Sequence, residues 1–97
     1  MLNYYSVIKG ESILVLDETF KNAKQKTVGF KQTQRALEKG CVRRVFMAKD
    51  AETHVRRPIL EWCASHDVEW IEVPTMRELG KACGIEVGTA VAAILKE

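Results

Sequence analysis

The chain has 97 residues, 46% of them hydrophobic, which is enough for one globular domain with a modest core and excludes a disordered protein. No apolar run approaches the ~20 residues that span a bilayer, and the basic region and long apolar block of a secretory signal are missing, so we expect no membrane partner. The net charge of +2 conceals two opposed segments: residues 20–49 carry nine Lys or Arg against one acid, and residues 50–75 carry two against six. This asymmetry predicts a polyanionic partner on one face.

The N-terminal part of the chain divides into an extension and the start of a domain. Residues 1–16 form an extension of undefined structure that contains the apolar run Ile13–Leu16. Asp17 is a favourable N-cap, so we expect a first helix at about 17–25. The domain is therefore expected to cover residues 17–97.

The most informative stretch is Gly29–Gly40, which follows the short β-prone run Lys26–Val28. A glycine opens this stretch, helix-compatible residues fill it, and Gly40 stands where a helix would end with a left-handed residue. Helical spacing turns four residues toward a core: Phe30, Thr33, Ala36 and Leu37. It turns four polar or basic residues largely toward solvent: Lys31, Gln32, Arg35 and Lys39.

The start of this helix is a candidate anion site. Free N–H groups in a first helical turn favour a negative group. Lys31 and Arg35 add positive charge where a phosphate could dock, and Gln32 offers a planar amide to a base edge. A solvated basic helix face without a ligand is the alternative interpretation.

Strands and helices alternate in the middle of the chain. A strand is predicted at Val42–Ala48, where the continuous apolar residues 45–48 indicate cover on both faces. A helix follows at about 52–66, for which Asp50 and Thr53 are candidate caps, and Pro58 must lie in its first turn or mark a kink. Its expected buried stripe consists of Val55, Ile59, Leu60, Cys63 and Ala64.

The last third of the chain continues the alternation. A strand is predicted at Val68–Val73 and stops at Pro74. Thr75 and Glu78 form a capping box for a short helix that Gly84 ends. The loop 85–88 and a small apolar segment at 89–95, read as a last strand, complete the chain. This order favours a layered α/β/α sandwich.

Neither metal binding nor catalysis is indicated. The three cysteines, Cys41, Cys63 and Cys83, are widely separated, so we expect reduced and mostly buried thiols in a cytoplasmic protein. No nucleophile–base constellation or phosphate-binding loop occurs, and no cofactor is expected. Trp62 and Trp70 lie in or near the acidic half and are expected to pack in the core rather than stack on bases.

Four segments resemble the kink-turn-binding ribosomal-protein superfamily, and its small bacterial ribosome-associated branch most closely. They are 29–37, 45–51, 78–84 and 85–88, in matching order over about 80% of the chain. The resemblance implies a three-layer α/β/α sandwich with a mixed four-stranded sheet. It also implies a non-catalytic protein that binds kink-turn RNA, a duplex bent sharply by a three-nucleotide bulge followed by sheared G·A pairs.

The resemblance assigns residues to two parts of such an RNA. The start of the second helix would lie against the G·A pairs through Gly29, Lys31, Gln32 and Arg35. The nearby loop would pack apolar side chains on the flipped bulge nucleotides through Ile85, Val87 and Ala90, with Glu86 between the first two. Phosphates crowded by the bend would be neutralised by the same cations together with Lys39, Arg43 and Arg44.

Positions 31 and 32 depart from the pattern of archaeal members, which typically have Asn and Glu there. Lys31 and Gln32 follow the bacterial branch. Gln32 can still donate and accept at a guanine edge but lacks the charge-assisted acceptor of Glu, so phosphate attraction increases at the expense of base readout.

The expected protein is a monomer whose partner is structured RNA, such as a kink-turn in rRNA or an mRNA leader, with the ribosome as a further partner. The alternative is a protein–protein adaptor on the same fold, in which the acidic residues 50–75 dock another factor and the RNA role is vestigial.

Overall fold

The structure, a computed structural model, describes residues 23–96. The elements follow in the order β1 (Lys26–Val28), α2 (Phe30–Lys39), β2 (Val42–Ala48), α3 (Thr53–Ser65), β3 (Glu69–Val73), α4 (Met76–Ala82) and β4 (Val91–Leu95). Each strand and helix predicted from residue 26 onward is present. The extension 1–16 lies outside the described residues, and so does the helix expected at about 17–25, except for its last three positions, which form an irregular segment before β1.

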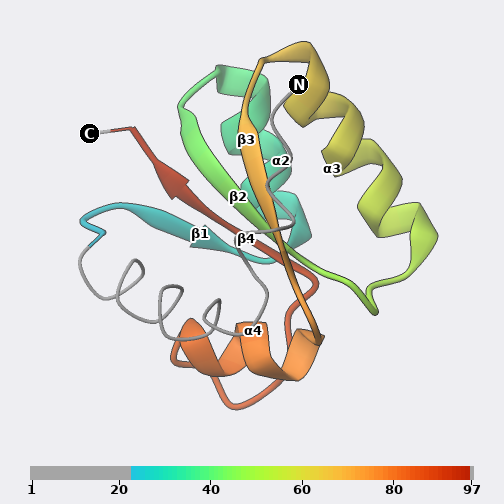
Figure 1. The fold of residues 1–97 in the computed structure, drawn as a ribbon. Coiled ribbons are helices and arrows are strands. Elements are labelled where there is room, and N and C mark those ends of the chain that lie inside the picture. Colours follow the sequence, from blue (N-terminus) through green and yellow to red (C-terminus); the bar gives the residue numbers. More distant parts are fainter. Residues whose placement is uncertain (1–22, 97) are drawn as a thin grey trace.

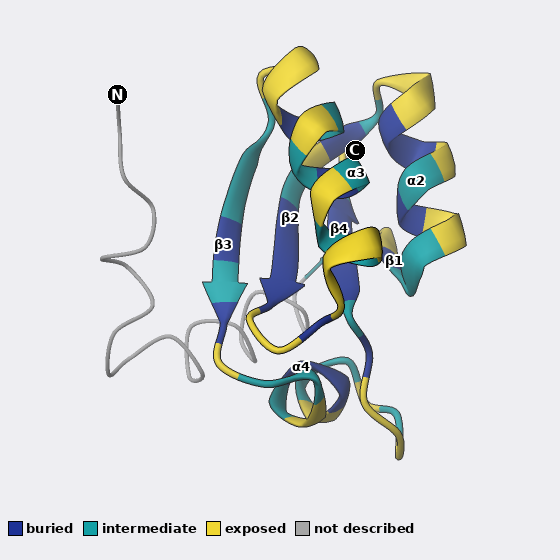
Figure 2. Ribbon diagram, turned by 90° about the vertical axis from the view of Figure 1, so that its right-hand side faces the viewer, coloured by how far each residue is buried: buried dark blue, intermediate teal, exposed yellow. Residues whose placement is uncertain are grey.

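The four strands form one mixed sheet in the order β1-β4-β2-β3 (Figure 1). β4 runs antiparallel to both of its neighbours, and β2 runs parallel to β3. α2 and α3 cover one face of the sheet, whereas α4 packs on the other face (Figure 2). The predicted α/β/α sandwich with a mixed four-stranded sheet is therefore confirmed.

β2 shows how the core is divided between the two faces. Val45 and Met47 pack with α2 and α3, whereas Phe46 and Ala48 pack with α4. All four side chains are at most 1% exposed. A strand covered on both faces needs no polar alternation, which explains its continuous apolar run.

α2 has the core face that its spacing predicts. Thr33, Ala36 and Leu37 are buried, and Phe30 is half-buried. The buried hydroxyl of Thr33 forms a hydrogen bond of 2.9 Å with the hydroxyl of Thr27, which joins α2 to β1. Each of these polar groups is thereby satisfied inside the domain.

The predicted capping of α3 is wrong. Its N-cap is Glu52, without a side-chain hydrogen bond, and Thr53 is already helical. Asp50 instead binds the start of α4, because its Oδ1 accepts from the Met76 N–H at 2.8 Å. The reason is topological: β2 and β3 are parallel, so the residues after both strands meet at one edge of the sheet.

The buried stripe of α3 is narrower than predicted. Ile59 and Cys63 are buried, and Val55 and Leu60 are half-buried, but Ala64 is exposed. Ala64 lies one turn beyond Leu60, which is already at the margin of the buried face. Pro58 lies inside the helix, past its first turn.

None of the helices within residues 23–96 is long and apolar enough to cross a membrane.

We expect Asp50→Ala to lower the free energy of unfolding by about 1 kcal/mol, as the loss of a helix cap does. The Met76 N–H would lose its acceptor at the start of α4. Glu52→Ala is the matched control, because Glu52 caps α3 by position only and its side chain bonds no backbone N–H there. Urea denaturation of both variants measures the difference, and equal losses would contradict this role for Asp50.

Candidate nucleic-acid interface

Gly29 forms the turn between β1 and α2 in a backbone conformation that only glycine adopts readily. Its φ of 98° and ψ of 166° lie in a region that residues with a Cβ rarely enter. In this conformation the Gly29 N–H donates to the carbonyl oxygen of Val91 at 2.8 Å, which holds the start of α2 against the start of β4. No atom lies within 4 Å of the place that a Cβ would occupy, so this side of the turn is open.

The first turn of α2 has the chemistry of an anion site. Its N–H groups have no partners within the helix, Gly29 provides no side-chain cap, and the turn contains no acid. Arg35 lies one helical turn after Lys31, and both side chains are exposed. Neither cation makes an ion pair with any of residues 23–96. Uncapped N–H groups, the helix dipole and these cations all favour a phosphate.

Gln32 is exposed beside this turn, and its side chain folds back toward β1. Its Oε1 accepts a hydrogen bond from the Val28 N–H at 3.4 Å, which is long for such a bond. This contact orients the amide while leaving its Nε2 without a partner among the described residues. The Nε2 group is therefore a donor available to a base acceptor.

The loop between α4 and β4 presents an apolar tip. Val87 is 71% exposed, and it is the only large hydrophobic side chain so exposed within residues 23–96. Ile85 and Ala90 are half-buried, and Glu86 is exposed. The loop lies directly on α4, since a Cβ on Gly80 would be 2.2 Å from the Val87 carbonyl oxygen.

A series of hydrogen bonds connects this loop to the start of α2. Met76 donates its N–H to Asp50 and accepts the Thr89 N–H on its carbonyl oxygen, at 2.8 and 3.1 Å. The Thr89 hydroxyl donates to the Val91 carbonyl oxygen at 3.1 Å. The same oxygen accepts the Gly29 N–H. The loop, α4 and the start of α2 are thus fixed relative to one another.

The two predicted patches lie at the same end of the domain. Figure 2 shows the lower end of α2 above the loop that follows α4, on the right-hand side of the view. Patches on opposite sides of the molecule could not have contacted one sharply bent RNA. The structure places Gly29 and the α2 residues Lys31, Gln32 and Arg35 at the same end of the domain as the loop residues Ile85, Glu86 and Val87.

Three other predicted cations lie away from this end. Lys39 is the last residue of α2, so it is about 15 Å along the helix axis from Gly29. Arg43 and Arg44 stand at the start of β2, beyond Lys39. Arg44 is further occupied by an ion pair with Glu69, with 2.7 Å between its Nε and the carboxylate Oε2.

The sequence did not predict the contacts of three residues that position α4 and the loop. They are Gly80, Thr89 and Asp50, the last of which accepts from the Met76 N–H instead of capping α3. Gly80 carried a usable signal, because a glycine inside a helix costs about 1 kcal/mol relative to alanine and so indicates a close approach. Thr89 and Asp50 carried none, since their partners are set by the tertiary fold.

Two of the cysteines, Cys63 and Cys83, and both tryptophans lie in or against the hydrophobic core. Burial raises the pKa of the Cys63 thiol to about 12 and that of Cys83 to about 11, so both stay protonated and are poor nucleophiles. Trp62 and Trp70 are partly buried and pack against the core on the side of α2 and α3, as predicted. No group of three His, Cys, Asp or Glu within the described part of the chain is placed to hold a metal ion.

The fold and the matching family model together define a small α/β domain of the ribosomal-protein type. The chain belongs to the ribosomal protein L7Ae/L30e/S12e/Gadd45 family, whose model matches residues 11–97. The resemblance inferred from the sequence is thereby confirmed.

Relatives from bacteria are similar over most of their length. RNA-binding protein TTE2299 of Caldanaerobacter subterraneus subsp. tengcongensis is 45% identical over 69 residues, which cover 71% of this chain and 84% of that protein. RNA-binding protein BH0128 of Halalkalibacterium halodurans is 40% identical over 79 residues, 81% of this chain and 96% of that protein. The structure of the Giardia lamblia 15.5kD RNA binding protein shares the fold, with a TM-score of 0.77 at 21% identity, covering 100% of this chain and 78% of that one.

Proposed function

We propose that this protein is a non-catalytic, monomeric RNA-binding protein of the cytoplasm that recognises kink-turn RNA and associates with the ribosome. RNA binding is supported by the family and by the names of its bacterial relatives. The finer assignment to kink-turn RNA is supported by two surfaces at one end of the domain. They are the basic start of α2, which suits crowded phosphates, and the apolar loop after α4, which suits an unstacked base.

The observation that carries this proposal is the hydrogen bond between the Gly29 N–H and the Val91 carbonyl oxygen. It fixes the uncapped start of α2 next to the segment that leads out of the apolar loop. A kink-turn presents crowded phosphates and sheared pairs beside unstacked nucleotides. One rigid site with both chemistries can therefore hold the bent form, whose features a straight duplex does not present to this site.

Each surface has its own part in the mechanism. Lys31, Arg35 and the N–H groups of the first turn of α2 lower the repulsion between phosphates that the bend brings together. Gln32 contacts a base edge through its Nε2 donor. Val87 covers an extruded base, which needs a surface to replace its lost stacking.

The acidic residues 50–75 give little support to an adaptor. Three of their six carboxylates have partners inside the domain: Asp50, Glu69 and Glu72. Two of these contacts, Arg44–Glu69 and Arg56–Glu72, are partly buried ion pairs within or beside the sheet. Half of this negative charge thus contributes to the fold rather than to a free docking face.

A kink-turn RNA with a fluorescence donor and acceptor on its two arms tests the proposal. Titration with protein is expected to raise energy transfer as the arms approach, and a duplex of equal length without the bulge should show no change. Equal affinity for both RNAs, with no rise in transfer, would instead leave the adaptor interpretation.

Val87→Asp is expected to weaken kink-turn binding at least about fivefold, because it removes an apolar contact with the extruded base and adds a negative charge near phosphates. Stability should stay within about 0.5 kcal/mol, since the side chain is 71% exposed. Val87→Ile keeps the apolar surface and is the matched control. Filter binding measures both, and unchanged affinity in Val87→Asp would remove the loop from the site.

A further inference from the structure

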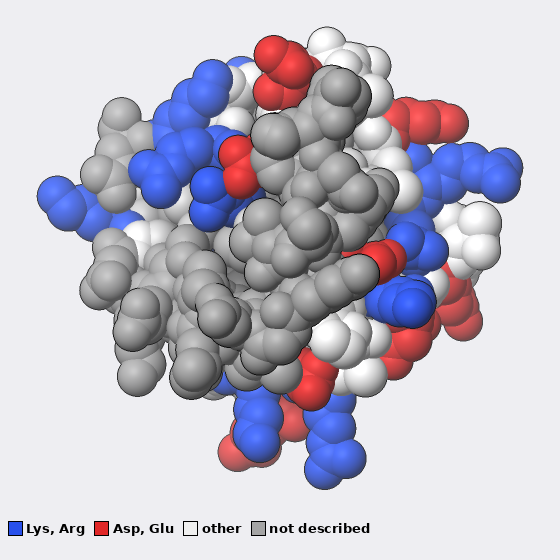
Figure 3. Space-filling model, in the orientation of Figure 1, with Lys and Arg blue, Asp and Glu red and all other residues white. Residues whose placement is uncertain are grey.

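A second group of cations lies at the end of the sheet farthest from Gly29, where β1 and β2 begin and β4 ends. Lys24, Arg43 and Lys96 are exposed at these three strand ends. Figure 3 shows Lys and Arg side chains gathered at the upper left, over this end of the three strands. Gly29 donates its N–H to Val91 and is level with it, so these cations lie four to five residues along the strands from the start of α2, or about 15 Å.

Backbone hydrogen bonds hold these strand ends side by side. The Lys96 N–H donates to the Cys41 carbonyl oxygen at 2.8 Å, two residues before Arg43. The Leu95 N–H donates to the Gln25 carbonyl oxygen at 3.0 Å, one residue after Lys24. The three cations are therefore placed by the sheet itself.

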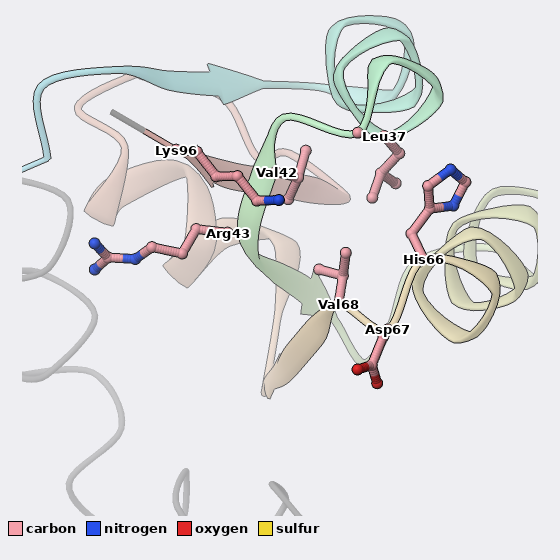
Figure 4. Close-up of a pocket in the computed structure, with 8 residues that line it drawn as sticks. Leu37, Val42, Arg43, His66, Asp67, Val68 and Lys96 are labelled. Carbon is pink, nitrogen blue, oxygen red and sulfur yellow. The ribbon is translucent and has the colours of Figure 1, made fainter.

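Arg43 is turned outward by an irregularity in the sheet. The pairing of β2 with β4 shifts register between Val42 and Arg44, so Arg43 is the extra residue. Such bulges redirect a side chain. Figure 4 shows the Arg43 side chain extending away from Leu37 and His66, while Lys96 lies across the start of β2.

Three of these cations are not used in ion pairs within the described part of the chain. Arg44 is neutralised by Glu69, but Lys24, Arg43 and Lys96 make no ion pair with any of residues 23–96. Among those residues, Asp67 is the one acid that lines the adjoining hollow of about 350 Å³, which Arg43, His66 and Lys96 also line. The last carbonyl oxygens of α2 already accept the Gly40 and Cys41 N–H groups, at 3.0 and 3.1 Å, so they do not require these cations.

We propose that Lys24, Arg43 and Lys96 form a second RNA-contact surface, which binds duplex phosphates without reading their sequence. The surface has charge but no exposed apolar centre, since the one exposed large hydrophobic side chain within residues 23–96, Val87, is at the other end. A protein partner would need such a centre, whereas a phosphate backbone needs only cations. The duplex belongs either to a long arm of the RNA held at Gly29 or to a second RNA segment.

The test uses wild-type protein saturated with a short-armed kink-turn RNA and then titrated with a fluorescent RNA duplex that has no bulge. We expect anisotropy to report a ternary complex. Arg43→Glu and Lys96→Glu should each weaken duplex binding and reduce its log–log salt slope by roughly 0.7–0.9 for each phosphate that is no longer neutralised. Arg57→Glu is the matched control, because Arg57 is exposed on α3 and the change in net charge is the same.

A parallel titration with long-armed kink-turn RNA distinguishes the two sources of duplex. Tighter binding of the long-armed RNA, abolished by Arg43→Glu, assigns the surface to the same RNA molecule. A ternary complex without any effect of arm length assigns it to a second RNA. Absence of duplex binding, or equal weakening by Arg57→Glu, overturns the proposal. If the protein does not bind kink-turn RNA, titration of the free protein with the duplex still tests this surface. Weaker duplex binding by Arg43→Glu and Lys96→Glu than by Arg57→Glu would support it.

Discussion

Gly29→Ala is expected to lower the free energy of unfolding by about 1–3 kcal/mol, the usual effect of forcing a side chain into a glycine conformation. With φ at 98° and ψ at 166°, the turn must either accept the strain or change its angles. A change of angles would move the Gly29 N–H away from the Val91 carbonyl oxygen. We therefore expect kink-turn affinity to fall together with stability, as measured by urea denaturation and filter binding.

Gly40→Ala is the control that separates a general loss of stability from a specific effect on RNA binding. Gly40 ends the same helix with φ 73° and ψ 23°, a left-handed conformation that costs other residues roughly 1–2 kcal/mol. No atom lies within 4 Å of a Cβ at Gly40, as at Gly29. This variant should lose stability but retain kink-turn affinity. Equal loss of affinity in both variants would show that Gly29 acts only through overall stability.

The second large effect is expected from Gly80→Ala. Its Cβ would lie 2.2 Å from the carbonyl oxygen of Val87, which is backbone and cannot rotate away. The loop must therefore move off α4, which we expect to lower stability by about 1–3 kcal/mol, as overpacking does. Kink-turn affinity should fall as well, because Val87 would be displaced from its place on α4, at the same end of the domain as the start of α2.

Hydrogen exchange can locate this displacement. The Ile85 N–H donates to the Gly80 carbonyl oxygen at 3.0 Å, and the Thr89 N–H donates to Met76. Both amides should exchange faster in Gly80→Ala. Gly88→Ala is the graded control, since its Cβ would be 3.1 Å from the Met76 backbone and needs a smaller shift. An effect of Gly88→Ala as large as that of Gly80→Ala would contradict this account.

Local signals in the sequence were sufficient for the architecture. Gly29 and Gly40 mark the ends of α2, and the apolar residues of β2 indicate a strand buried on both faces. Thr75 does cap α4, since its side chain accepts from the Glu78 N–H at 3.0 Å. For α2 and α4 the signals that define the helix ends lie within a few residues along the chain, and for β2 the run of apolar residues itself carries the signal.

Contacts between distant residues could not be predicted in the same way. The acceptor for the Met76 N–H is Asp50, 26 residues earlier, and nothing in the chain marks the pair. Arg44 has the composition of a phosphate ligand, yet Glu69 on the neighbouring strand binds it. These two outcomes depend on which strands lie side by side, which periodicity does not encode. The distance of Lys39 from Gly29 follows instead from the length of α2, which its sequence does predict.

The position of β4 in the sheet also sets the time at which the site can form during synthesis. β4 lies between β1 and β2, although it is made after every other strand. Among residues 23–96, β1 pairs with β4 alone, so this pairing and the hydrogen bond from the Gly29 N–H to Val91 cannot form until Val91–Leu95 has emerged from the ribosome. The proposed RNA site is therefore completed only after β4 has emerged.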